Sequence, residues 1–489
     1  MLKRAKGASF DAMALTFVRI LTILISMVIY KLLAMTFSVE EYGTYSSAML
    51  VSTTTTSLII LGLTDAINYF YAKERNEKKG RVFVYTIFLI QVVIGVFSAL
   101  LLILIQKPIA MYFDNLFVAK LIPCVAFLPL LTNMSHMLQV LFVTAKKAKV
   151  LAIRNLVFAI LKITFIAGVC FFLKSIYAIL VVTLVLELAN VLYMLFYCGK
   201  NIFKIEIKKA DLKLIKSILK YSIPMAAYIL TNSMSKEIGK LVIGALGTSE
   251  MLGIYSIASK ELPFDILTTS FLTVLIPYIT RNIGDKDFSS ATNVFSKYIQ
   301  ITYLVTWIVA GGVLVCSEEL MLILYDEKYL LGRNVFCLYI IVDMMKFASV
   351  SLIFSVTNRA KELLCYSAAA LFLNALLSIV FFNIWGLIGP TIATLIITLV
   401  LSCIIMGRSA HILHTNVFEL LNVKQMICLL AEGVVFGGLA MLFKQHFEGQ
   451  FYSIIMFAIC YSIFFIPMIL MNWKKILHLL KEINKSKLT

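Results

Sequence analysis

The chain has 489 residues, of which 61% are hydrophobic and only 14% are charged. Apolar runs of about 20 residues recur from end to end, and no polar stretch is long enough to form a soluble domain. This composition predicts an all-α integral membrane protein and excludes a soluble enzyme. The formal net charge of +18 follows from membrane topology, as shown below, so no nucleic-acid partner is expected.

Apolar windows predict 14 membrane spans. The first is too long for the apolar part of a signal peptide and lacks a cleavage site of small residues, so it is expected to be retained. An even number of spans places both termini on the same side of the membrane. The spans are predicted at 13–35, 46–71, 82–105, 116–143, 150–173, 176–198, 221–245, 252–279, 298–317, 331–356, 363–383, 386–407, 425–443 and 451–472.

The basic residues orient these spans. Most of the 44 Lys and Arg residues fall in the first tail and in every second connection. Connections rich in Lys and Arg stay in the cytoplasm, so both termini are expected to be cytoplasmic. The main basic clusters lie at Lys73–Arg81, Lys146–Arg154, Lys200–Lys220 and Lys474–Lys487.

A segment of the chain occurs twice. The pattern Glu-x-x-Gly-x-Tyr-Ser-x-Ala stands at residues 40–48 and again at 250–258, and Lys-Ala-Lys at 147–149 corresponds to Arg-Ala-Lys at 359–361. The two offsets, 210 and 212 residues, are nearly equal. A chain that repeats once at half its length is typically built from two copies of one unit.

Pairing the copies predicts four parts. Residues 1–199 and 221–410 form two six-helix bundles, which share one orientation because each has an even number of spans. Residues 200–220 form a cytoplasmic linker, in which Asp211 is expected to cap an amphipathic helix lying on the membrane surface. Residues 411–489 supply two further spans and a basic cytoplasmic tail. Pro123, Pro129 and Pro263 fall inside predicted spans, where each either serves as a hinge or fixes a static kink.

Four motifs carry a resemblance to a known family. The segments around the repeat resemble the polysaccharide flippases of the Wzx type, which belong to the multidrug/oligosaccharidyl-lipid/polysaccharide exporter superfamily. The similarity covers about residues 10–410, and the motifs together specify the superfamily but not the exported sugar. The motifs are Glu41–Ala48, Tyr221–Pro224, Gly253–Ala258 and Gly386–Ala393.

The resemblance implies a V-shaped pair of bundles that alternate between inward-open and outward-open states. Such a protein moves a polyprenyl-pyrophosphate-linked oligosaccharide (undecaprenyl pyrophosphate is the expected carrier) to the outer leaflet of the bacterial cytoplasmic membrane. The product would be a cell-surface polysaccharide such as O-antigen or capsule. A polymerase and a chain-length regulator are the expected partners, the protein is expected to act as a monomer, and no cofactor is expected. The two extra spans could form a groove for the lipid tail.

Ionisable residues at bilayer depth are costly and are functional candidates by default. The basic candidates could contact a pyrophosphate or an acidic sugar, or could be structural or interfacial. Lys236 and Lys240 share one helical face, whereas Glu237 points about 100° away from Lys236. The expected substrate-binding residues are Arg19, Lys31, Lys162, Lys236, Lys240 and Lys260.

Buried acids are candidates for coupling to a proton or sodium gradient. The candidates are Glu187, Asp265 and Asp343. They could equally be structural partners of bases. The expected ion pairs are Arg19 with Asp65, Lys162 with Glu187, and Lys346 with Asp343, and Glu261 and Asp265 could neutralise the lysines near the seventh and eighth spans.

Other functions fit the sequence less well. A cation or multidrug exporter of the same superfamily would favour unpaired acids in the first bundle, whereas that bundle has more bases than acids. A membrane glycan polymerase, ligase or glycosyltransferase is the enzymatic alternative, but the longest external connection, about 318–330, is short. Asp285-Lys286-Asp287 is interpreted as a solvated loop, and His411 and His414 as a loop pair. The nine scattered cysteines indicate neither a disulfide framework nor a metal site.

Overall fold

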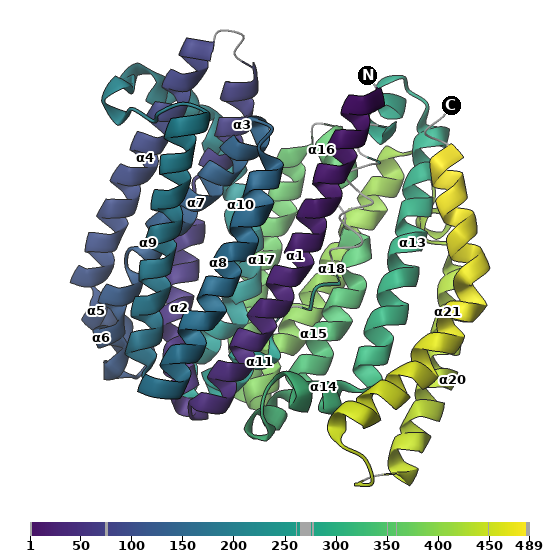
Figure 1. Cartoon of the computed structure of the whole chain (residues 1–489). Helices are drawn as coiled ribbons and strands as arrows, with labels where there is room; N and C mark the ends of the chain where they lie inside the picture. Colours follow the sequence, from purple (N-terminus) through teal and green to yellow (C-terminus); the bar gives the residue numbers. More distant parts are fainter. Residues whose placement is uncertain are drawn as a thin grey trace. The chain divides into compact units, whose positions relative to one another are not determined.

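A computed structural model describes residues 2–73, 77–260, 262–264, 275, 278–349, 351–357, 359–447 and 449–485. These residues are α-helical apart from short 3-10 and π turns and connecting loops. The protein is an all-α, multi-pass membrane protein. By contacts between Cα atoms the chain divides into two compact units, Met1–Ser256 (unit 1) and Ile257–Thr489 (unit 2) (Figure 1).

Unit 1 holds two helices that the repeat assigns to the second copy. Its helix α10 packs on α2, α3 and α4, which brings α10 and most of α11 into this unit by contact. The buried core joins α3, α4, α7 and α9 with Phe203 from the linker. The helices are α1 (Leu2–Thr36), α2 (Val39–Ile59), α3 (Leu63–Lys73), α4 (Glu77–Leu104), α5 (Gln106–Tyr112), α6 (Leu116–Val125), α7 (Leu128–Thr144), α8 (Ala148–Gly168), α9 (Ile176–Asn201), α10 (Ile215–Leu246) and α11 (Ser249–Ala258).

Unit 2 has its core between α13 and the last helices of the chain. Helix α21 packs closely against α13: a Cβ on Gly311 would lie 2.7 Å from Phe464, and one on Gly312 would lie 2.7 Å from Tyr461. The helices of the unit are α13 (Phe288–Val315), α14 (Ser317–Leu324), α15 (Arg333–Met345), α16 (Leu352–Val356), α17 (Ala360–Trp385), α18 (Gly389–Ile412), α19 (Val417–Leu421), α20 (Val423–His446) and α21 (Ser453–Lys485).

In the described residues, eleven segments are long and apolar enough to cross a membrane. One of them, Lys361–Ile412, covers both α17 and α18. Helix α10 is not among the eleven, although its 32 residues could cross a bilayer. Most of the predicted span at 252–279 lies outside the described residues. The predicted fold class is therefore confirmed, whereas the count of 14 spans stays a prediction.

The predicted second and fourth spans are each divided. Helix α2 ends before Leu61 and Gly62, which have φ of 44° and 64°, and α3 then begins. The fourth span becomes α6, which contains Pro123, and α7, which has Pro129 in its first turn. Proline removes a helical hydrogen bond and clashes with the preceding turn, which accounts for a break near these two residues. Whether either proline acts as a hinge or fixes a static kink stays a prediction. Pro263 lies in a turn after α11.

The linker differs from its predicted form. Asp211 does act as a cap, since its carboxylate accepts from the Lys213 backbone N–H at 2.9 Å. The helix that it caps, however, is a three-residue 3-10 turn, and α10 follows at once. The Asp211 backbone N–H donates to the Thr86 hydroxyl, and the Arg81 guanidinium lies 5.2 Å from the Phe203 ring centre. These contacts hold the linker on α4, which explains why no separate amphipathic helix forms.

Candidate functional site

A buried guanidinium marks the polar interior of unit 1. Arg154 of α8 is only 7% exposed. Its Nε donates to Asn190 Oδ1 at 2.6 Å, its Nη1 to Asn155 Oδ1 at 2.5 Å and its Nη2 to Ser135 Oγ at 2.9 Å. The acceptors come from α7, α8 and α9, and all three are neutral. Each nitrogen of the guanidinium thus donates to a neutral acceptor, which does not cancel its charge.

One carboxylate lies beside this network. Glu187 of α9 accepts a hydrogen bond from Asn190 Nδ2 at 3.3 Å, and it interacts electrostatically with both Arg154 and Lys162. His136 of α7 also lies within electrostatic reach of Glu187. Arg154 and Lys162 therefore lie within electrostatic reach of the same carboxylate, that of Glu187. We refer to Ser135, Arg154, Lys162, Glu187 and Asn190 as the Arg154 cluster.

Two members of this cluster, Lys162 and Glu187, were predicted as candidates from the sequence, whereas Arg154 was not. Lys162 and Glu187 were expected to interact, and they do so through space, although in the described part of the chain no ion pair joins them. Arg154 was grouped with the cytoplasmic bases of the preceding loop. Its position inside the predicted span at 150–173 was the available signal, because it lies about 9 Å along α8 from Ala148. Ser135 and Asn190 gave no signal, since isolated polar residues are common in apolar helices.

Helix α10 carries the predicted pair of lysines. Lys236 is exposed, whereas Lys240 forms an ion pair with Glu237 at 2.9 Å, with both side chains about one-fifth exposed. Residues three apart lie on adjoining positions of one helical face. Glu237 therefore serves Lys240, a role that the sequence argument did not assign to it. This pairing weakens the case for Lys240 as an anion-binding group.

Helix α1 carries the two remaining candidates of unit 1. Arg19 has an exposed side chain, and Lys31 is half-buried. The expected pairing of Arg19 with Asp65 of α3 is wrong: in the described residues no ion pair joins them. The predicted contact rested on a shared depth in the membrane, which does not determine which way the side chains face.

The predicted site residues of unit 2 are Lys260, Asp265 and Asp343. Asp343 of α15 is buried and forms an ion pair with Lys346 at 2.6 Å, as the three-residue spacing predicted. Lys260 follows α11 and is half-buried. Asp265 and Glu261 lie outside the described residues. The role of Lys260 in substrate binding stays a prediction.

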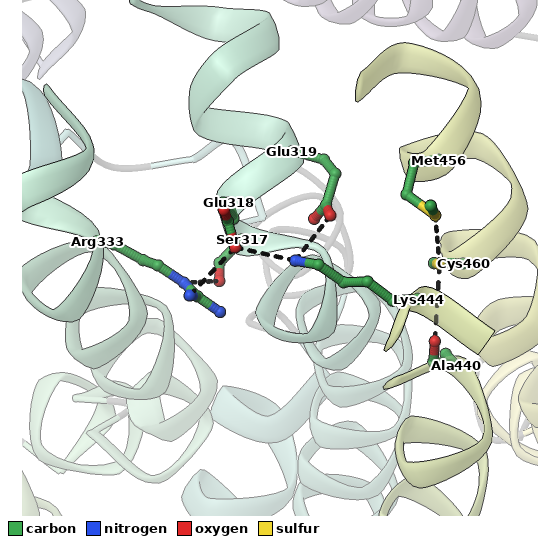
Figure 2. A network of polar contacts seen from close by, with 8 residues as sticks. All are labelled: Ser317, Glu318, Glu319, Arg333, Ala440, Lys444, Met456 and Cys460. Atoms are coloured by element: carbon green, nitrogen blue, oxygen red, sulfur yellow. Dashed lines mark hydrogen bonds and ion pairs between the residues drawn. The ribbon is translucent and has the colours of Figure 1, made fainter. Parts of the chain in front are cut away.

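A second charged cluster in unit 2 joins three helices (Figure 2). Lys444 Nζ of α20 lies 3.0 Å from Glu318 Oε2 and 2.7 Å from Glu319 Oε1, both on α14. Arg333 at the start of α15 lies 3.2 Å from Glu318 Oε2 and donates to Ser317 Oγ at 3.4 Å. The hydrogen bond from Lys444, helped by the charges of Lys444 and Arg333, lowers the pKa of Glu318. In this Lys444 cluster (Ser317, Glu318, Glu319, Arg333 and Lys444) two bases balance two acids, and the contacts link α20 to α14.

The ends of α17 and α18 hold a third arrangement. Arg408 Nε donates to Glu362 Oε1 at 2.5 Å, and the Tyr366 hydroxyl donates to the same carboxylate at 2.8 Å. Arg359 lies 3.4 Å from the other oxygen of Glu362. Arg408 and Arg359 thus share the one carboxylate of Glu362, and both contact it directly.

Comparisons with solved structures place this fold. An inward closed conformation of the lipid II flippase MurJ has a TM-score of 0.73 at 14% identity, covering 96% of this chain and 99% of that one. An inward-facing multidrug resistance transporter of the MATE family has a TM-score of 0.65 at 11% identity, covering 81% and 96%. A superfamily transporter from Pyrococcus furiosus has a TM-score of 0.55 at 12% identity, covering 83% and 94%. At these identities the likeness shows the fold alone.

The sequence comparison is more specific. No curated protein sequence matches this chain. The family described as polysaccharide biosynthesis protein matches residues 12–331, which is well over half of the chain. The match includes the Arg154 cluster, both occurrences of the Glu-x-x-Gly-x-Tyr-Ser-x-Ala pattern and the described residues among the predicted substrate-binding bases. The chain belongs to the polysaccharide biosynthesis protein family.

Proposed function

We propose that this protein is a flippase that moves a polyprenyl-pyrophosphate-linked oligosaccharide from the cytoplasmic to the outer leaflet by alternating access. Membership of the polysaccharide biosynthesis family and the fold shared with flippases and multidrug transporters support this proposal. The substrate belongs to the assembly of a cell-surface polysaccharide such as O-antigen or capsule. The protein resides in the bacterial cytoplasmic membrane with both termini in the cytoplasm, where the basic connections favour that orientation.

The excess of positive charge in unit 1 carries the proposal. In the Arg154 cluster, Arg154 and Lys162 face one carboxylate, Glu187, and neutral side chains supply the remaining hydrogen bonds of the guanidinium. Charge at bilayer depth is costly unless something compensates it. A pyrophosphate or an acidic sugar would provide that compensation during passage, with the lysine acting as a point charge.

The proposed substrate-binding residues are ranked by the exposure of their side chains and by the ion pairs that they form. Arg19, Lys162 and Lys236 present exposed side chains and are the first choices. Lys31, Lys240 and Lys260 are the second choices, since Lys240 already pairs with Glu237. Glu187 is the first choice for coupling to an ion gradient because two cations compete for it. Asp343 and Asp265 remain coupling candidates of lower rank, Asp343 because Lys346 neutralises it.

Reconstitution tests the activity directly. Purified protein in liposomes should move a fluorescently labelled, polyprenyl-pyrophosphate-linked oligosaccharide between leaflets, measured as the fraction that an impermeant quencher reaches. Arg19→Ala and Lys236→Ala should insert normally but slow this movement at least tenfold. In cells, the same variants should accumulate the lipid-linked sugar on the cytoplasmic leaflet. Export of an organic cation by the liposomes, without movement of the lipid, would instead identify a multidrug exporter, and wild-type rates in both variants would refute the site assignment.

The partners are tested separately. A polymerase and a chain-length regulator of the same pathway should consume the flipped product, and the flippase itself is proposed to act as a monomer. Flipping by liposomes that contain at most one copy of the protein each would support a monomer. A rate that depends on the square of the protein density would argue against it.

A further inference from the structure

Aromatic side chains gather in unit 1 where α3 meets α10. The rings of Tyr69 and Tyr221 are stacked, with their centroids 4.3 Å apart and their planes inclined by 17°. The Phe70 ring turns its edge to Tyr221 at 5.6 Å and stacks on Phe83 of α4 at 4.6 Å. Four rings from three helices therefore hold one another in fixed orientations.

The outermost of these rings is only partly covered. Tyr221, Phe70 and Phe83 are half-buried, whereas Tyr69 is 38% exposed. The Tyr221 ring supports Tyr69 from one side. Tyr69 is thus a flat apolar surface that is held in place from behind and accessible to a ligand.

Polar groups lie on the same face of α3. Asp65 and Asn68 are four and one residues before Tyr69, so all three side chains lie on one side of the helix. Asn68 is exposed, and its Oδ1 accepts from the Thr144 hydroxyl at 3.2 Å. Its Nδ2 has no hydrogen-bond partner in the described part of the chain. An amide donor is therefore available beside the Tyr69 ring.

The Asp65 carboxylate supplies an acceptor on this face. It is half-buried and interacts electrostatically with Tyr221, and within the described residues it forms no ion pair. A carboxylate at bilayer depth is costly against lipid, so this face of α3 is expected to look into water. The basic clusters Lys73–Arg81 and Lys200–Lys220, which the charge pattern predicts to be cytoplasmic, adjoin the two tyrosines in the sequence.

We propose that Asp65, Asn68, Tyr69 and Tyr221, which we call the tyrosine platform, bind a sugar ring of the lipid-linked oligosaccharide at the cytoplasmic end of unit 1. A pyranose presents C–H groups on its faces and hydroxyl groups around its rim. Its C–H face packs on the Tyr69 ring, the Asp65 carboxylate accepts hydrogen bonds from hydroxyl groups, and Asn68 Nδ2 donates to a sugar oxygen. The substrate class rests on the proposed function, whereas the assignment to the sugar rests on the platform.

Two other ligands suit the platform less well. A pyrophosphate would be repelled by the Asp65 carboxylate, so the platform and the proposed cationic residues serve different parts of one substrate. An organic cation would be attracted by a carboxylate beside aromatic rings, but the free N–H donors of Asn68 would gain nothing from it. The experiments below therefore include a cation.

Transport kinetics test the platform in the liposome assay. Tyr69→Ala should raise the KM for the labelled lipid-linked oligosaccharide about tenfold and change kcat by less than about twofold, because binding is lost and the transport steps are not. Tyr69→Phe keeps the flat ring and should keep the KM of the wild type. Tyr177→Ala removes another exposed tyrosine of unit 1 and should also leave the KM unchanged. An unchanged KM in Tyr69→Ala, or an equal rise in Tyr177→Ala, would overturn the proposal.

A binding measurement needs no transport. Tyr69→Trp keeps a flat ring and adds a fluorescent reporter, which is read against the wild type with its three native tryptophans. The probe is the free oligosaccharide that mild acid releases from the lipid-linked precursor, without lipid or pyrophosphate. It should shift the emission of Tyr69→Trp, and Asp65→Asn in the same protein should weaken this binding about fivefold, because the ionised acceptor is lost. A shift with tetraphenylphosphonium instead of the sugar would identify a cation site, and no shift with the sugar would also overturn the proposal.

The two measurements separate this proposal from the proposed function. A wild type that moves no lipid-linked oligosaccharide, while Tyr69→Trp still responds to the free sugar, would refute the flippase and support the platform. A wild type that moves the lipid, while Tyr69→Ala keeps its KM, would support the flippase and refute the platform. Thermal unfolding of Tyr69→Ala should match the wild type, since Tyr69 is exposed.

Discussion

The bases of the charged clusters in the two units have different kinds of partner. In unit 1, Arg154 is bonded to three neutral side chains, and one carboxylate is shared between Arg154 and Lys162. In unit 2, Lys444 is bonded to two carboxylates, and Arg408 to one. Arg154 of unit 1 is therefore held by neutral groups, whereas Lys444 and Arg408 of unit 2 each contact a carboxylate directly, that of Glu362 being shared by Arg408 and Arg359.

This contrast distinguishes the proposed ligand-binding cluster from ion pairs that only hold helices together. Ion pairs with complete partners hold helices together but offer nothing to a ligand, because both charges are satisfied. A guanidinium on neutral acceptors is fixed in place and still exerts its field. The repeat supplies similar helices to both halves of the chain, and substitution of single residues then gives them different electrostatics. Residue 366, which the 212-residue offset aligns with Arg154, is a tyrosine.

Removal of Arg154 should have the largest effect on stability. Arg154→Ala leaves the amide oxygens of Asn155 and Asn190 without the guanidinium donor and removes one of the positive charges near Glu187, so we expect a loss of about 3 kcal/mol. The measurement is thermal unfolding of the purified protein in detergent. Lys149→Ala, at an exposed position of the same helix, should unfold like the wild type. The double variant Arg154→Ala/Glu187→Gln should recover only part of the lost stability, because the neutral partners of Arg154 stay without a donor. Full recovery would mean that Arg154 stabilises the protein only through its charge interaction with Glu187.

Neutralisation of Lys444 should have the next largest effect. Lys444→Met keeps the apolar stem but strands Glu319, which is 5% exposed, and we expect a loss of about 2 kcal/mol in the same unfolding measurement. Here Lys444→Met/Glu319→Gln should recover most of the loss, since the carboxylate is the partner. A recovery no better than that of the Arg154 double variant would remove the contrast between the units.

Arg408→Ala should have a smaller effect than either. Its partner Glu362 keeps the hydroxyl of Tyr366 and the guanidinium of Arg359, so no carboxylate is stranded. We expect a small decrease in the unfolding temperature and no change in export. A decrease as large as that of Arg154→Ala would show that the stability lost on removing a base depends on its pairing and not on how deeply it is buried.

The smallest effect should be a dependence on pH. Because the pKa of Glu318 lies below its ordinary value of 4.5 when the protein is folded, its pairing stabilises the folded state above pH 4.5 and is lost as the pH falls through the lowered pKa. The unfolding temperature of the wild type should therefore fall below pH 4.5 more steeply than that of Glu318→Gln. Parallel curves for the two proteins would mean that Glu318 gains nothing from Lys444 and Arg333.

Sequence alone determined the class of the protein and much of its local structure. Apolar length and spacing gave the helices, the prolines at 123 and 129 gave a divided span, and the three-residue spacing of Asp343 and Lys346 gave an ion pair. These features depend on neighbours along the chain, so the sequence contains them directly. The repeat also identified Gly43 and Gly253 as related positions, and in the structure they are neighbours: a Cβ on Gly253 would lie 3.0 Å from the Gly43 nitrogen.

Only the tertiary structure decided which remote residues meet. Several polar contacts join segments that are separated by many residues. They are those of Arg154 with Ser135 and Asn190, of Asn115 with Thr44 and Ser249, and of Lys444 with Glu319. The sequence specifies the depth of each side chain in the membrane but not its direction around the helix axis relative to other helices, which packing decides. For this reason the expected pair of Arg19 and Asp65 did not form, while Arg154, ranked among the loop bases, became the centre of the site.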